Sequence, residues 1–312
     1  MAKFLYWQDG HTKGVNSCNR IGDYWSDWLL KFKELVSIAK ENKCEAILDG
    51  GDLVETKNPS YNVLDEIADI IEEGKIPMYS LFGNHSMNSG HIENSTNTGL
   101  AHLQRRSKYF KYLNRFESCE SNIVGYEYYY GIEEDIKKNG IMIKVEEKGI
   151  NDLPNQFNVA IVHALVTPKK FFENTSYITP DQIKTNADLV LLAHYHHPFS
   201  KKVGNTEFLN IGCFGRLDIN EAKITPSVLL LDTDKRSYEV IKLKSAKLGN
   251  EVFNLTKYNE LKGNKKGIED FISSLKNLNF QGMEIGTQIV NIGKKDKKYD
   301  KAVKYLLDKI GD

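Results

Sequence analysis

Short apolar runs alternate with longer amphipathic segments along the first part of the chain. The runs at 3–7 (KFLYW), 45–52 (EAILDGGD) and 76–85 (IPMYSLFGNH) end in polar or glycine-containing turns, which predicts three buried strands. Between them, residues 25–41 and 60–74 repeat apolar side chains at three- and four-residue spacing, which predicts amphipathic helices. This alternation is typical of α/β architecture.

The pattern continues to about residue 245 and then changes. A polar stretch at 86–98 precedes a predicted helix at 99–115, and loops of this length are usually functional or mobile. Two buried strands and a β-meander come next, at 157–166, 188–197 and 207–245. The lysine-rich remainder predicts a helix near 266–278, a strand at 286–292 and a helix near 298–310. We therefore expect a main domain over 1–248 and a small α+β region over 249–312.

Five of the strand ends carry side chains that can bind a metal ion. In chain order they are Asp9 with His11, Asp52, Asn84 with His85, His163, and His194 with His196. Ligands bind at the carboxyl ends of strands in open α/β sheets, so these loops can meet at one crevice. Each histidine taken alone favours a hydrogen-bonded structural role, but five of the chain's eight histidines belong to this ordered set. The set as a whole therefore predicts metal ligation.

The donor atoms of this set are nitrogen and oxygen, without a thiolate. Such donors suit Mn²⁺, Fe or Zn²⁺ and differ from those of a structural thiolate zinc site. The set is too large for one tetrahedral ion and fits two. Two ions about 3.5–4 Å apart can activate a water molecule and neutralise the oxygens of a phosphoryl group. The residues therefore predict a two-metal centre.

The ordered motifs D-x-H, GD, GNH, a lone histidine after a strand, and H-x-H resemble the calcineurin-like metallophosphoesterase superfamily over about residues 1–220. The resemblance implies two mixed β-sheets packed as a sandwich and flanked by helices. It implies that one metal ion is held by Asp9, His11 and His196. It implies that Asn84, His163 and His194 hold the other ion and that Asp52 bridges the two.

The same resemblance implies two catalytic roles and is interrupted at three positions. His85 would face the phosphate as an electrophilic helper or as the proton donor to the leaving oxygen, and Glu55 would orient it. Ser86 follows GNH where an acidic residue is usual, Ala193 replaces a glycine, and Gln8 replaces a small hydroxyl residue. None of the three changes removes a ligand.

Residues 193–221 (AHYHHPFSKKVGNTEFLNIGCFGRLDINE) resemble the SbcD-type DNA repair exonucleases, with Gly212, Arg216 and Glu221 at the matching positions. This resemblance implies a phosphodiester hydrolase that cuts DNA as an exo- or endonuclease, with Mn²⁺ as the favoured ion. It also implies an SbcC-type ATPase partner, a homodimer, and a capping or partner-binding role for residues 249–312. The alternatives are a small-molecule phosphodiesterase or protein phosphatase of the same superfamily, and a non-catalytic scaffold. The full ligand set and His85 argue against the scaffold.

Four further residues are candidate substrate contacts. Arg105 and Arg106 begin a basic run with interleaved aromatic residues, which can follow a phosphate backbone or form a solvated helix face. Arg216 can clamp a phosphate or pair with Asp218 or Glu221. His197 would point away from His194 and His196 in an extended segment, towards a bound substrate.

Composition limits the class of protein. The 42 basic and 42 acidic side chains cancel, so DNA binding would need a local patch. The amino-terminal residues have no signal-peptide pattern, and no apolar stretch approaches the ~20 residues needed to span a bilayer. The four cysteines are widely spaced and predict reduced thiols. We expect a cytoplasmic protein without a membrane segment.

Overall fold

A computed structural model describes residues 2–17, 20–87, 97–117, 121–143, 156–170 and 176–256. The chain divides into two compact units, 1–253 and 254–312, and the strands and helices named below belong to the first. The elements predicted near 266–278, 286–292 and 298–310 lie outside the described residues. Among the helices of the described ranges, none is long and apolar enough to cross a membrane.

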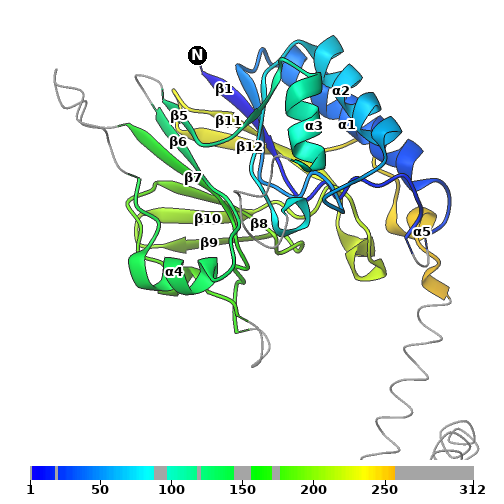
Figure 1. The fold of residues 1–312 in the computed structure, drawn as a ribbon. Coiled ribbons are helices and arrows are strands. Elements are labelled where there is room, and N and C mark those ends of the chain that lie inside the picture. Colours follow the sequence, from blue (N-terminus) through cyan, green and yellow to red (C-terminus); the bar gives the residue numbers. More distant parts are fainter. Residues whose placement is uncertain are drawn as a thin grey trace, which may run out of the picture. The chain divides into compact units, whose positions relative to one another are not determined.

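Two six-stranded mixed sheets form the first unit (Figure 1). The first sheet has the order β12 (Ser237–Lys242), β11 (Ser227–Asp232), β1 (Lys3–Trp7), β2 (Ala46–Asp49), β3 (Met78–Ser80), β4 (Phe110–Tyr112). The second has the order β5 (Arg115–Glu117), β6 (Ser121–Tyr126), β7 (Phe157–His163), β8 (Leu189–Ala193), β10 (Thr206–Asn210), β9 (Phe199–Val203). Neighbours β1, β2, β3 and β4 are parallel, as are β6, β7, β8 and β10.

Helices cover the outer face of each sheet. α1 (Tyr24–Glu41), α2 (Tyr61–Gly74) and α3 (Gly99–Arg106) lie against the first sheet, and α4 (Ile132–Asn139) lies against the second (Figure 1). A short helix, α5 (Gly249–Val252), follows β12. The predicted α/β sandwich flanked by helices is confirmed.

The alternation of side chains along β1 explains why its apolar run is unbroken. Leu5 and Trp7 point towards the helices, whereas Phe4 and Tyr6 point into the layer between the two sheets. A strand covered on both faces needs apolar side chains at successive positions. Because β1 is buried in this way, the polar residues that follow Trp7 begin where the core ends.

The predicted helix at 99–115 is wrong beyond Arg106. α3 ends there, and the chain continues as β4, which pairs with β3. Phe110 is buried in the core, and the ring of Tyr112 lies 4.6 Å from that of Phe82. The apolar period in this run is therefore two rather than 3.6, and pairing with β3 decides the structure.

Two of the four cysteines lie in the described residues. Cys44 and Cys213 are buried free thiols, whereas Cys18 and Cys119 lie outside the described residues.

β8 ends at Ala193, and His194 has a positive φ of 79°. The H-x-H motif is therefore a turn, and the expectation that it is extended is wrong.

Replacing Leu231 by alanine should test the layer between the sheets. Leu231 is completely buried in β11, and a buried Leu→Ala change typically lowers the free energy of unfolding by ~2–5 kcal/mol. Leu30→Ala on α1 is the matched control, because Leu30 is 53% exposed and should change stability by less than ~0.5 kcal/mol. Urea unfolding measures both, and equal losses would contradict the assigned core.

Candidate metal centre

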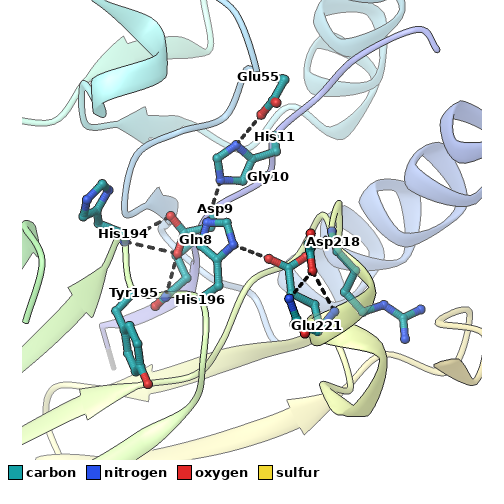
Figure 2. Close-up of polar contacts among 12 residues, drawn as sticks. Gln8, Asp9, Gly10, His11, Glu55, His194, Tyr195, His196, Asp218 and Glu221 are labelled. Carbon is teal, nitrogen blue, oxygen red and sulfur yellow. Dashed lines mark hydrogen bonds and ion pairs between the residues drawn. The ribbon is translucent and has the colours of Figure 1, made fainter. Parts of the chain in front are cut away.

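The candidate ligands come from the carboxyl ends of strands in both sheets. Asp9 and His11 follow β1, Asp52 follows β2, Asn84 lies in a 3₁₀ turn after β3, His163 ends β7, and His194 with His196 follow β8. Figure 2 shows side chains from three of these loops gathered in one place, together with two supporting carboxylates. The parallel strands bring to one rim residues that are up to 187 positions apart (Asp9 to His196).

The backbone is strained at several of these residues. Eight non-glycine residues in the described ranges have positive φ, and four of them are Asp9, His11, Asp52 and His194. This conformation is uncommon for residues with a side chain, and it persists only when surrounding contacts hold it. Here the amide of His11 donates to the carbonyl of Asp52 at 2.8 Å, and that of Asp9 donates to Gly51 at 3.1 Å. The strain therefore coincides with the candidate site.

Asp9, His11 and His196 form the first group, whose donor atoms lie within 4.8 Å of one another. The Nε2 atoms of His11 and His196 are 2.9 Å apart. Each Nδ1 faces a carboxylate, that of Glu55 at 2.8 Å for His11 and that of Glu221 for His196 (Figure 2). An ionised carboxylate only accepts hydrogen bonds, so Nδ1 carries a proton and Nε2 is the nitrogen left to bind a second proton or a cation.

Two facing lone pairs repel unless a proton or a cation lies between them. One divalent ion would accept the lone pairs of both nitrogens and remove this repulsion. The separation of the two Nε2 atoms fits that arrangement. The first group therefore fits a divalent cation.

Asp52, His163 and His194 form the second group. His163 donates from Nδ1 to the carbonyl of Gly50 at 2.8 Å, so Nε2 is the nitrogen that can hold either a proton or a metal ion. That Nε2 lies 3.1 Å from Oδ2 of Asp52 and 3.3 Å from Oδ1 of Asn84. Oδ2 of Asp52 is buried and has no well-formed hydrogen bond within the described residues. Acceptor atoms again converge, which fits a second cation.

The pKa shifts of the candidate ligands also indicate that a positive charge is favoured between them. Burial lowers the pKa of His163, but the charge and hydrogen bond of Asp52, the charge of Asp9 and the carbonyl of Gly50 together outweigh burial and raise that pKa to about 9. Burial likewise opposes the charged form of Asp52, but His163 holds the pKa of Asp52 well below its usual range. Burial and the neighbouring His163 lower the pKa of His194 to about 4. A divalent ion would replace the proton on His163, because both use the same lone pair.

Asp52 lies beside both groups. Its donor oxygens belong to the group with His163 and His194 and also lie within 4.8 Å of donor atoms of His11 and His85. A carboxylate has two oxygens, so it can contact two ions at once. Its position fits the bridging role that the resemblance implies.

His85 lies next to the centre and is half-exposed. Its amide donates to Oδ1 of Asp52 at 3.0 Å, and its Nδ1 donates to the backbone carbonyl of Glu55 at 2.8 Å. Nε2 is therefore the nitrogen available to a substrate. The carboxylate of Glu55 lies 3.5 Å from Nδ1 of His85 but 2.8 Å from Nδ1 of His11. Glu55 thus orients His85 chiefly through its backbone, and its side chain holds His11.

Gln8, at one of the three departures from the family pattern, has a structural role that the sequence did not reveal. Its side chain is buried and donates from Nε2 to Oδ2 of Asp9 at 3.0 Å and to Oδ1 of Asn210 at 3.2 Å. The hydroxyl of Tyr6 donates to its Oε1 at 2.9 Å. The signal was a polar residue directly after an apolar strand, and its role is to orient Asp9. The sequence suggests Glu221 only as part of the branch pattern and as a partner of Arg216, whereas in the structure it holds His196.

The four candidate substrate contacts lie in different settings. Arg216 is 3% exposed and donates to the carbonyls of Ile224 and Lys247 rather than to the carboxylates suggested by the sequence. Its guanidinium is used inside the protein, which argues against a phosphate clamp. Arg106 pairs with Asp65 and Asp69 on α2. Arg105 and His102 are among the residues that line a cavity of about 510 Å³. His197 is exposed, and its ring lies beside that of Tyr195.

The sequence matches the model of a known protein family. A family model described as calcineurin-like phosphoesterase matches residues 18–198, more than half of the chain. The match includes Asp52, Asn84, His163, His194 and His196, and begins after His11. No curated protein matches the sequence.

Several solved structures resemble the chain at low identity. TT1561 of Thermus thermophilus is 13% identical, with a TM-score of 0.45 over 78% of this chain and 99% of its own. A protein described as a novel archaeal phosphodiesterase is 16% identical, with a TM-score of 0.40 over 77% and 99%. A putative 5′-nucleotidase from Staphylococcus aureus is 14% identical, with a TM-score of 0.44 over 78% and 54%. We draw no conclusion about reaction or substrate from these likenesses.

Gly83→Ala should weaken binding of divalent ions. A Cβ at Gly83 would overlap Oδ1 of Asp52, so the carboxylate would have to move. We expect metal affinity to fall about 10–100-fold, the usual effect of disturbing groups that orient a ligand. Competition with a chelating dye measures the affinity. Gly204→Ala in the β9–β10 hairpin is the control: its φ of 59° makes alanine strained there, but a Cβ meets no atom within 4 Å. An equal loss of metal affinity in both variants would contradict the assignment.

Glu221→Ala should also weaken metal binding, because it removes the acceptor that holds Nδ1 of His196. The expected loss is about tenfold or more in affinity, measured in the same dye competition. Asp218→Ala is the matched control: Asp218 caps the same 3₁₀ turn but makes no described contact with His196. If Asp218→Ala weakened binding as much, the effect would belong to the turn and not to the histidine.

Proposed function

The chain belongs to the calcineurin-like phosphoesterase family, and from that premise we propose that it is a two-metal phosphodiester hydrolase acting on DNA. The observation that carries the proposal is the pair of converging donor groups, with Asp52 in the second group and also beside His11 of the first. Asp9, His11 and His196 would hold one ion. Asn84, His163 and His194 would hold the other, with Asp52 between them. Nitrogen and oxygen donors of this kind suit Mn²⁺, Fe or Zn²⁺, and we propose Mn²⁺.

The side chains around the ions have separate tasks in this proposal. When bound, the ions would supply Lewis-acid activation of water and neutralise charge on the phosphate. Glu55 and Glu221 keep the Nε2 lone pairs of His11 and His196 directed inward. In its imidazolium form, with Nδ1–H bonded to the carbonyl of Glu55, His85 would donate a hydrogen bond or a proton from Nε2 to the leaving oxygen. The carboxylate of Glu55, 3.5 Å from Nδ1, supplies the counter-charge for that form.

Support for DNA as substrate comes from the segment at 193–221. In the resemblance to SbcD-type nucleases this segment includes an acidic residue, and here that residue, Glu221, contacts a candidate ligand. We extend the proposal to exonuclease activity in DNA repair, a homodimer and an SbcC-type ATPase partner contacted through residues 249–312. These last three points rest on the resemblance alone.

A small-molecule phosphodiesterase is the second candidate. The basic run after residue 104 is not a continuous helix face, and Arg106 is paired with Asp65 and Asp69. The net charge of the chain is zero. Both features weaken the electrostatic attraction for a polyanion.

Cleavage of labelled linear and circular DNA with Mn²⁺, beside a bis-aryl phosphodiester, separates the two candidates. The proposal predicts that linear DNA and the aryl diester are both cut, and that a chelator abolishes both reactions. Hydrolysis of the aryl diester without any cleavage of DNA would leave the small-molecule phosphodiesterase. Cleavage of neither would favour the non-catalytic alternative.

His85→Ala should retain metal and lose turnover. Proton transfer by a positioned side chain typically contributes 10²–10⁴-fold, so we expect kcat on the aryl diester to fall by about that factor. Metal content of the purified variant should stay unchanged, because His85 is outside the proposed ligand set. His102→Ala on α3 is the control and should behave like the wild type. Activity within a few-fold of the wild type would remove His85 from the catalytic role.

A further inference from the structure

A cavity of about 570 Å³ lies beside the candidate metal centre, and the proposed two-metal chemistry does not use it. The ring of His194 forms part of its wall, and the ring of Tyr128 lies 5.9 Å away from it at an angle of 34°. The other lining residues include Tyr130, Glu133, Glu134 and Leu165. A molecule whose phosphate sits at the centre can therefore extend directly into this space.

Two tyrosines offer aromatic faces to the cavity. Tyr128 is held in place by its amide, which donates to the carbonyl of Phe82 at 2.9 Å. Tyr130 is 87% exposed, so its ring is accessible to a ligand. Nucleobases stack on such rings regardless of their sequence, because every base has a π-face. The cavity volume is within the range of pockets that bury a small ligand and suits a nucleoside.

The charged residues of this cavity disfavour a phosphate. α4 begins here, and its first turn carries Glu133, Glu134 and Asp135. Three carboxylates offset the positive end of the helix dipole, which would otherwise attract an anion. Within the described lining, the charged side chains are Glu133 and Glu134. Carboxylate oxygens accept hydrogen bonds from hydroxyl and amino groups such as those of a sugar or base.

The carboxylates are themselves fixed. Oε1 of Glu133 accepts from the amide of Leu165 at 2.9 Å, and Oε1 of Glu134 accepts from the hydroxyl of Ser176. Glu133 is 7% exposed. Within the described residues, no hydrogen bond uses the second oxygen of either carboxylate, so that oxygen can accept from a ligand. The cavity therefore has oriented acceptors as well as an aromatic wall.

We propose that this cavity binds the terminal nucleoside adjacent to the scissile phosphate, with Tyr130 stacking on the base. The proposal rests on the phosphodiesterase function proposed above and makes it more specific. Because the charged side chains of the described lining, Glu133 and Glu134, are acidic, the bound nucleoside carries no further phosphate. The substrate is thus the end of a strand or a simple nucleotide diester, which favours exonuclease over endonuclease action.

Nucleoside binding is measured first without turnover. Thymidine and adenosine are titrated calorimetrically into metal-free wild-type protein, Tyr130→Ala and Tyr61→Ala. Tyr61 is 71% exposed on α2 and is not among the residues lining this cavity, so it is the matched control. We expect both nucleosides to bind the wild type and Tyr61→Ala equally, and Tyr130→Ala about tenfold more weakly. No nucleoside binding, or equal loss in both variants, would overturn the proposal. Choline is titrated as well, because aromatic side chains also bind quaternary ammonium ions, and binding of choline in place of nucleosides would overturn the proposal too.

Kinetics with Mn²⁺ then separates this proposal from the function on which it rests. The p-nitrophenyl ester of thymidine 5′-phosphate is compared with bis-p-nitrophenyl phosphate. Tyr130→Ala should raise KM for the nucleoside ester about tenfold and leave the bis-aryl diester unchanged. Glu134→Gln should improve binding of thymidine 3′-phosphate relative to thymidine. If nucleosides bind but neither ester is hydrolysed, the proposed function fails while the nucleoside site stands; equal effects of Tyr130→Ala on both esters would overturn the site.

Discussion

The structure depends on one electrostatic constraint, the convergence of ligand nitrogen and oxygen atoms on positions where a positive charge is needed. Nε2 of His11 and Nε2 of His196 face each other at 2.9 Å because a carboxylate holds the other nitrogen of each ring. Nε2 of His163 faces oxygens of Asp52 and Asn84 because its Nδ1 is held by a backbone carbonyl. Without positive charge between them, these atoms repel. Cation binding relieves the repulsion, so the arrangement of donor atoms in the folded protein favours binding of metal ions.

The two-sheet scaffold imposes that geometry. Strands β1 and β8 are buried on both faces, so they are rigid up to the residue at which the ligands begin. In the turns that follow, Asp9, Asp52 and His194 adopt the left-handed backbone conformation, with positive φ. This conformation costs free energy, which the packing of the core offsets. Gly51, with φ of 105°, permits a close approach: a Cβ there would lie 2.5 Å from Nδ1 of His163. The tight packing explains why small residues flank the ligands.

The sequence was a good guide to the parts of the molecule that follow local periodicity. Apolar runs of strand length ending in polar turns predicted the sheets, and the order of the motifs predicted which side chains the fold would bring together. Pairing between distant segments was harder to predict. The run after Arg106 has helix-forming residues, yet pairing with β3 makes it a strand. The positive φ of His194 depends on contacts with Asp9, whose carboxylate accepts the amide of His194 at 3.1 Å, and no pattern near residue 194 reveals that contact. Gln8 and Glu221 were likewise visible as residues, but their partners were not.

The central claim is that one chain presents two cation sites that share a carboxylate. Titration of the metal-free protein with Mn²⁺, followed by calorimetry and by elemental analysis after gel filtration, tests it most directly. The account predicts two ions per chain for the wild type and one for His196→Ala, whose remaining ion would be held by Asn84, His163 and His194. A wild-type stoichiometry of one or zero, or two ions retained in His196→Ala, would contradict it.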